Sequence, residues 1–201
     1  MSELKAVVIG LGNIGMGYDY YDQSSIISHA NAFYCHPKFK LIAGVDPLKE
    51  RQDLFTRKFN TPTFANYSEC SQTHLDIDIA AISVPESMHM ETFKQVVKSG
   101  VKNVICEKPL GKSLNDSIRI RDLTDTYQTN TIVNYMRRFD PGIRKIKNII
   151  KDKKLGQLEK IHIWYSGSYR TNASHFIDIS NFILGDIDIK NITVTSNQIK
   201  E

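Results

Sequence analysis

Five short apolar runs, separated by longer stretches with helical spacing, constrain the fold of this chain more than any other feature. The runs are rich in Val, Ile and Ala, whereas the stretches between them mix apolar and charged residues with helical periodicity. Strands that are nearly all apolar belong to a parallel sheet with helices on both faces. We therefore predict an α/β fold, a doubly wound parallel sheet over residues 1–135, with strands at 5–10, 40–46, 78–85, 101–107 and 130–136 and helices at 47–59, 86–100 and 113–128.

The remainder of the chain has a different pattern. It predicts a helix at 140–156, a long alternating strand at 157–169, a helix at 174–185 closed by Gly185, and a second alternating strand at 189–199. Two strands and two helices make a poor independent domain, because a strand pair needs more sheet to bury its face. We expect residues 136–201 to be the start of an α/β second domain that is incomplete.

Composition excludes several classes of protein. The formal net charge of +4 is small and the basic residues are dispersed, which argues against binding to nucleic acid. The N-terminus lacks a long apolar stretch, so we expect neither a signal peptide nor a membrane span. Cys35, Cys70 and Cys106 have the spacing of neither a disulfide framework nor a zinc site. These features predict a cytoplasmic protein without a metal site.

A glycine-rich loop follows the first predicted strand. Gly10, Gly12 and Gly15 lie in "VVIGLGNIG", after the strand and before a helical stretch. In that setting the first glycine permits a tight turn, the second lets a pyrophosphate approach the backbone, and the third lets the helix pack against the strand. The pattern predicts that residues 10–15, including Asn13 and Ile14, bind a dinucleotide. The alternative is a purely structural turn.

Asp46 ends the second predicted strand, where a dinucleotide-binding domain places the acid that binds the adenosine ribose. It lies further along than the usual spacing of about 20 residues. We attribute the delay to an insertion after Gly15, with the helix resuming near Ser28. A carboxylate here would repel a 2′-phosphate, so we predict NAD(H) rather than NADP(H), although Lys49 and Arg51 lie nearby. Alternatively, Asp46 only opens the turn with Pro47.

The predicted strand at 101–107 runs into the sequence "CEKPLG". Pro109 cannot donate to a central ladder, so the strand ends at the edge where ligands bind in open α/β sheets. Together with the glycine loop, this segment resembles the glucose–fructose oxidoreductase and inositol dehydrogenase family (Gfo/Idh/MocA), which pairs a Rossmann domain with an α/β substrate domain. Three further segments resemble that family: "SVPESMH", "NYMRRFDP" and "TNASHFIDISNFILG".

The resemblance implies functional residues. Ser83, Pro85 and His89 match a strand-end motif near the cofactor, with Glu86 where asparagine is common. Lys108 would lie beside the nicotinamide ribose and the substrate hydroxyl, orienting that hydroxyl and joining proton transfer. Glu107 would position Lys108 near the cofactor, or form a plain ion pair.

His175 matches the catalytic acid–base of the family. A neutral imidazole suits removal of a hydroxyl proton. Asp178 could instead pair with His175 or satisfy backbone groups. Tyr135, Arg137 and Tyr169 are candidate substrate residues, and packing at the domain interface is their alternative role. Asn172 is a candidate to hydrogen-bond a sugar hydroxyl of the substrate.

The chain departs from the family in two respects. Thr171 and Ala173 stand where many members carry an acid or asparagine and a glycine, and Thr171, which carries no charge, argues against a proton relay through that position. Family members also continue well past this length. The chain is therefore either a fragment or a shortened member stabilised by self-association, and we expect a homo-oligomer.

These patterns favour an NAD-dependent oxidoreductase that acts on a secondary hydroxyl of a sugar, nucleotide sugar or cyclitol. The alternative is a non-catalytic dinucleotide-binding protein, such as a redox sensor or a degenerate paralogue. A third reading, an amino-acid or homoserine dehydrogenase, is weakened by the Glu107–Pro109 run.

Overall fold

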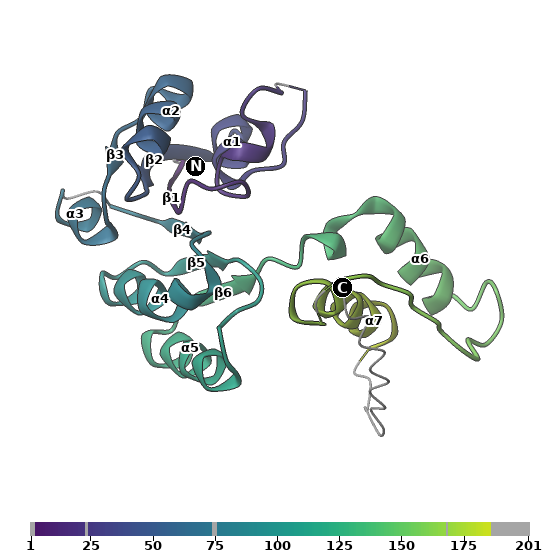
Figure 1. Ribbon diagram of the computed structural model, residues 1–201. Coiled ribbons are helices and arrows are strands. Elements are labelled where there is room, and N and C mark those ends of the chain that lie inside the picture. Colours follow the sequence, from purple (N-terminus) through teal and green to yellow (C-terminus); the bar gives the residue numbers. More distant parts are fainter. Residues whose placement is uncertain (1–2, 23, 74–75, 168, 186–201) are drawn as a thin grey trace, which may run out of the picture. The chain divides into compact units, whose positions relative to one another are not determined.

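The computed structural model of the chain describes residues 3–22, 24–73, 76–167 and 169–185, with the side chain of Tyr169 excepted. The chain divides into two compact units, residues 1–134 and residues 135–201 (Figure 1). Each unit is described by itself.

The first unit is built on a parallel sheet of six strands in the order β3-β2-β1-β4-β5-β6. This is the strand order of a Rossmann domain, and it confirms the predicted doubly wound α/β fold. Five strands match the predicted runs; the two-residue β3 was missed because it is too short to show a periodic pattern. The strands are β1 (Leu4–Ile9), β2 (Phe39–Val45), β3 (Thr63–Phe64), β4 (Ile79–Ile82), β5 (Asn103–Cys106) and β6 (Asn130–Val133).

Both faces of this sheet are buried. Along β1, Val7 and Ile9 join one apolar cluster, and Ala6 and Val8 join another on the opposite face. Residues of α3 (Tyr67–Gln72), α4 (His89–Lys98) and α5 (Leu114–Tyr127) complete the first cluster, and residues of α1 (His29–Cys35) and α2 (Lys49–Phe59) complete the second. This two-sided burial is why the strands read as nearly continuous apolar runs.

Side-chain caps fix where several helices begin. The hydroxyls of Ser28 and Ser113 and the amide oxygen of Asn66 each accept a backbone N–H three residues on, at the starts of α1, α5 and α3. The helices of the first unit are α1 (His29–Cys35), α2 (Lys49–Phe59), α3 (Tyr67–Gln72), α4 (His89–Lys98) and α5 (Leu114–Tyr127), with short 3₁₀ turns η1 (Gly17–Asp19) and η2 (Glu86–Met88).

The described part of the second unit is helical. It contains η3 (Met136–Phe139), α6 (Pro141–Lys151), the π-helical turn η4 (Tyr169–Ala173) and α7 (Ser174–Leu184). The Asp140 carboxylate caps α6 by accepting from Gly142 and Ile143. The ammonium of Lys147 on α6 lies 3.8 Å from the ring centroid of Phe182 on α7, so a cation–π contact joins the two helices.

The strand predicted at 157–169 was wrong for the residues that the structure describes. Residues 157–167 contain no strand, although their side chains alternate in polarity. A strand needs a hydrogen-bonded neighbour, and every described strand belongs to the sheet of the first unit. The strand predicted at 189–199 lies outside the described residues.

Candidate functional site

The glycine loop leaves the carboxyl end of β1 under tight steric constraint. Gly10 has a φ of +92°, and a Cβ there would lie 2.6 Å from the backbone of Ser83. A Cβ on Gly15 would lie 1.9 Å from the carbonyl oxygen of Gly10. At Gly12, in contrast, an added Cβ would meet only the Arg51 guanidinium, at 3.9 Å. Gly10 and Gly15 are therefore required by packing, whereas Gly12 keeps an open approach to the backbone.

Residues 12–17 close a single helical turn. The N–H groups of Met16 and Gly17 donate to the carbonyl oxygen of Gly12, at 2.9 and 3.0 Å. No described residue accepts from the N–H groups of Gly12, Asn13 or Ile14. Such donors at the start of a helical turn form a binding site for an anion. The residues present therefore fit the pyrophosphate of a dinucleotide.

The turn continues into α1 across an insertion. His29 donates its N–H to Ile14 and Ala30 donates to Gly15, at 3.0 and 2.9 Å. In a continuous helix the donor lies four residues after the acceptor. Here it lies fifteen residues after, so residues 18–28 form an eleven-residue excursion out of the helix. Asp46 is 31 residues after Gly15, and without those eleven the spacing is the usual 20 or so.

Asp46 is 2% exposed and its carboxylate is engaged on both oxygens. Oδ2 accepts the N–H of Leu11 at 2.8 Å and lies 3.2 Å from Nη1 of Arg51, and Oδ1 accepts the N–H of Leu48 at 2.9 Å. The carboxylate thus fixes the glycine loop and also orients Arg51, a half-exposed cation beside Gly12.

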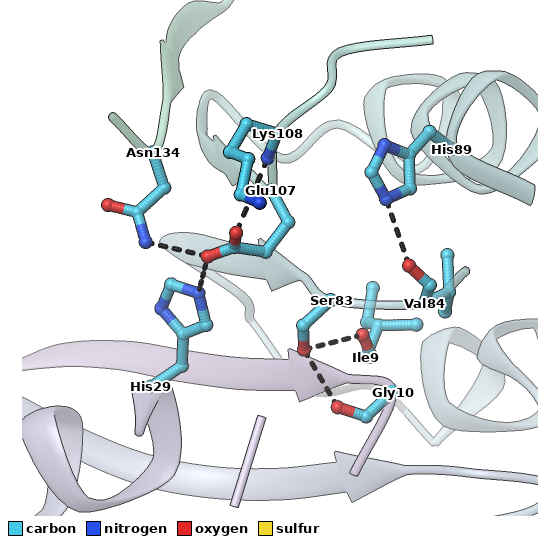
Figure 2. A network of polar contacts seen from close by, with 9 residues as sticks. All are labelled: Ile9, Gly10, His29, Ser83, Val84, His89, Glu107, Lys108 and Asn134. Atoms are coloured by element: carbon cyan, nitrogen blue, oxygen red, sulfur yellow. Dashed lines mark hydrogen bonds and ion pairs between the residues drawn. The ribbon is translucent and has the colours of Figure 1, made fainter. Parts of the chain in front are cut away.

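The strand-end motif after β4 supports the glycine loop from the neighbouring strand (Figure 2). The Ser83 hydroxyl donates to the carbonyl oxygen of Gly10 at 2.7 Å. Pro85 is exposed and precedes η2. His89 is only 1% exposed, and its ring nitrogens lie 2.9 Å from the carbonyl oxygens of Val84 and Pro109. The His89 ring therefore links the loops that follow β4 and β5.

Glu107 forms the centre of a buried polar network at the ends of β5 and β6 (Figure 2). Its Oε1 lies 2.8 Å from Nε2 of His29 and accepts the side-chain N–H of Asn134 at 2.6 Å. Its Oε2 accepts the backbone N–H of Lys108 at 3.3 Å. Burial alone would raise the pKa of Glu107, but the bonds from His29, Asn134 and Lys108 outweigh burial and hold the pKa below its usual value. Lys108 therefore follows directly on a carboxylate that stays ionised.

The candidate residues of the second unit gather at the start of α7. The rings of Tyr135 and His175 make an edge-on contact with centroids 5.8 Å apart. Burial, followed by the charge of Asp178, raises the pKa of Tyr135. Asp178 accepts two hydrogen bonds from the Arg138 guanidinium. This pair of bonds engages the Asp178 carboxylate, which the sequence analysis named as an alternative partner of His175.

The remaining predicted substrate residues have local contacts in the same unit. The Arg137 guanidinium lies 5.3 Å from the ring centroid of Phe176. The Asn172 side chain is exposed, donates to the carbonyl oxygen of Ser166 at 2.6 Å and accepts from the Thr171 hydroxyl. The side chain of Tyr169 lies outside the described residues.

Sequence reasoning missed His29, Asn134 and Arg138. Asn134 and Arg138 lie in the segment "NYMRRFDP", but neither was selected as a site residue, and His29 lies outside the quoted motifs. Each gains its contact from a residue at least 27 positions away. The available signal for His29 was its place directly after the helix cap Ser28. Within the described residues there is no cluster of metal-ligating side chains, and none of the described helices has the length and apolar character needed to cross a membrane.

Comparison with known proteins identifies the family. The family model GFO_IDH_MocA, described as an oxidoreductase family with an NAD-binding Rossmann fold, matches residues 4–135. The chain belongs to the Gfo/Idh/MocA oxidoreductase family. That finding confirms the resemblance seen in the glycine loop and in the Glu107–Pro109 segment.

Two curated members and one solved structure illustrate the family. The scyllo-inositol 2-dehydrogenase (NAD(+)) of Bacillus subtilis (strain 168) is 28% identical over 93% of this chain and 51% of its own length. An inositol 2-dehydrogenase of Rhizobium meliloti (strain 1021) is 27% identical over 60% of this chain and 40% of its own length. The scyllo-inositol dehydrogenase of Lactobacillus casei, solved with bound NAD(H) and scyllo-inositol, superposes with a TM-score of 0.76 at 19% identity, over 92% of this chain and 57% of that one.

The structural likeness at this identity shows the shared fold. The chain spans about half or less of the length of these curated relatives.

Proposed function

We propose that the chain binds NAD(H) at residues 10–15, and that the protein transfers a hydride between the nicotinamide and a secondary hydroxyl of a cyclitol or sugar. The observation that carries the proposal is the row of N–H donors at Gly12, Asn13 and Ile14, for which no described residue is an acceptor. The names of the relatives, which are inositol dehydrogenases, favour a cyclitol within that substrate class.

The bound nicotinamide would supply the hydride acceptor or donor, and the residues of the chain would handle the proton and the hydroxyl. Lys108 would orient the hydroxyl through its ammonium group. The backbone at Lys108 is fixed for this role, because its N–H donates to the carboxylate of Glu107. His175 would take the hydroxyl proton as a general base. Tyr135, whose ring contacts His175, would fix the orientation of the imidazole.

NAD(H) is the preferred nucleotide in this proposal. The carboxylate of Asp46 lies directly after β2, at the strand end where the adenosine ribose of a Rossmann ligand lies, and it would repel a 2′-phosphate. Arg51 opposes that preference, since its guanidinium is half-exposed beside Gly12. We therefore expect NADP(H) to bind more weakly than NAD(H) but measurably.

Replacement of Gly12 tests the cofactor site. Gly12→Val would place a side chain where the pyrophosphate approaches, so NADH binding followed by fluorescence should be lost. The fold should tolerate the change, because a Cβ at Gly12 meets only a flexible guanidinium at 3.9 Å. An unchanged melting temperature is the control for folding, and unchanged NADH affinity would rule out this site.

A non-catalytic dinucleotide-binding protein is the second candidate. Thr171 favours it, because a hydroxyl replaces the acid that would complete a relay to His175. Such a protein would bind NADH with the same dependence on Gly12, yet would reduce or oxidise no polyol.

A further inference from the structure

We propose that His29 is a positioning residue for Lys108, acting through Glu107, and that the excursion of residues 18–28 serves to set His29 in place. The inference rests on the proposed function, in which Lys108 orients the reacting hydroxyl. No sequence motif assigns His29 a role, and it lies 78 residues from its partner in the chain.

The carboxylate of Glu107 has little freedom. It is 8% exposed, and its two oxygens accept from three side-chain or backbone groups: His29, Asn134 and Lys108. These donors come from α1, from the end of β6 and from the turn itself. Loss of one donor would leave a buried charge partly unsatisfied, and the carboxylate would reorient toward water.

The ionisation of Glu107 also fixes the tautomer of His29. The pKa of Glu107 is held below its usual value, so near neutral pH the side chain is an acceptor only. Nε2 of His29, at 2.8 Å, must therefore carry the proton and donate it. This is the relation in which a carboxylate orients an imidazole, and here the imidazole in turn orients the carboxylate.

The excursion is built to hold this geometry. Asp19 is fully buried, and its carboxylate accepts from the N–H groups of Ile27 and Ser28 and from the Ser28 hydroxyl. Lys58 on α2 donates to the carbonyl oxygens of Asp19 and Tyr20, at 2.7 and 2.9 Å. The start and the end of the excursion are thus tied together, immediately before His29.

Three variants of the full chain test the inference. His29→Leu removes the donor at similar volume, His29→Gln restores an N–H at about the same reach, and His36→Gln is the matched control at the exposed end of α1. A misplaced catalytic group costs on the order of 10²-fold in rate, so His29→Leu should lower kcat by about that factor with KM for NAD unchanged. His29→Gln should recover most of the rate, and His36→Gln should equal the wild type.

Two results would overturn the inference: wild-type kcat in His29→Leu, or a loss in His29→Gln as large as in His29→Leu. A second readout needs no turnover. Nitrogen-15 NMR of the wild-type imidazoles should show the proton of His29 on Nε2, and an Nδ1–H tautomer would refute the bond to Glu107. Failure of the proposed function would appear separately, as a wild-type chain that binds no NADH.

Discussion

Three buried carboxylates organise the first unit at the scale of single residues. Asp19, Asp46 and Glu107 each accept several N–H or O–H groups. Asp46 and Glu107 tie together segments that are remote in the sequence, and Asp19 joins the two ends of the excursion. Burial of a charge is costly unless hydrogen bonds satisfy it, so these positions tolerate few replacements. Asp46 fixes the loop and orients Arg51, whereas Glu107 fixes the turn that presents Lys108.

Arg51 should tune the preference between the two nucleotides. Arg51→Ala removes the guanidinium beside Asp46, so we expect NADPH affinity to fall by roughly tenfold, while NADH affinity changes little. Lys49→Ala is the control, because that ammonium is exposed and pairs with Asp53 at 3.0 Å. Calorimetric titration of each variant with NADH and with NADPH measures the ratio of the two affinities. Equal losses for NADH and NADPH in Arg51→Ala would contradict this role.

The excursion is the distinctive structural element of the chain. It interrupts a helical turn at the glycine loop and returns to the same helix eleven residues later. Asp19 is the buried centre of this segment. Burial alone would raise the pKa of its carboxyl, but the hydrogen bonds from Ser28, Ile27 and Asn31 hold the pKa below its usual value. The described ends of the excursion are therefore held together by charge-assisted hydrogen bonds.

Asp19→Asn should destabilise the chain and change its response to acid. The amide of asparagine replaces one accepting oxygen of the carboxylate by an NH₂ group, which cannot accept from the surrounding N–H and O–H donors. We expect this loss to cost roughly 1–3 kcal/mol of unfolding free energy. The lowered pKa values of Asp19 and Glu107 stabilise the fold above the unfolded pKa of about 4, and this contribution is lost as the pH falls through the folded values. Urea unfolding from pH 7 to pH 3 should show a shallower loss in Asp19→Asn than in the wild type. Asp125→Asn, on the exposed side of α5, is the control and should keep the wild-type stability at each pH. Wild-type stability at each pH in Asp19→Asn would show that the bonds to Asp19 contribute nothing.

Local sequence patterns predicted most of the helices and strands of the first unit, but not the side-chain contacts between them. The buried strands were predictable because a sheet covered on both faces leaves continuous apolar runs, and the helix starts because Ser28 and Ser113 are local caps. The bonds from His29 and Asn134 to Glu107 depend on the packing of α1, β5 and β6, which no local pattern encodes. The strand predicted at 157–169 failed for a related reason, since alternation alone does not supply a partner strand.

At the scale of the whole molecule, the chain combines a Rossmann unit with a second unit that carries His175. The Rossmann unit holds every residue proposed to bind the cofactor, together with Lys108. In the second unit, Ile146, Leu155 and Trp164 expose apolar surface. The expected self-association of the chain stays a prediction, and light scattering at high concentration would test it.

The most direct measurement is the rate of NAD reduction by the full chain with a panel of cyclitols and sugars, compared between wild type and Lys108→Ala. We expect turnover in the wild type and a fall in kcat of roughly 10²–10⁴ in Lys108→Ala, with only a modest change in NAD affinity. Lys98→Ala, at the exposed end of α4, should leave the rate unchanged. Turnover at the wild-type rate in Lys108→Ala would contradict the account, as would a wild-type chain that binds NADH and oxidises no member of the panel.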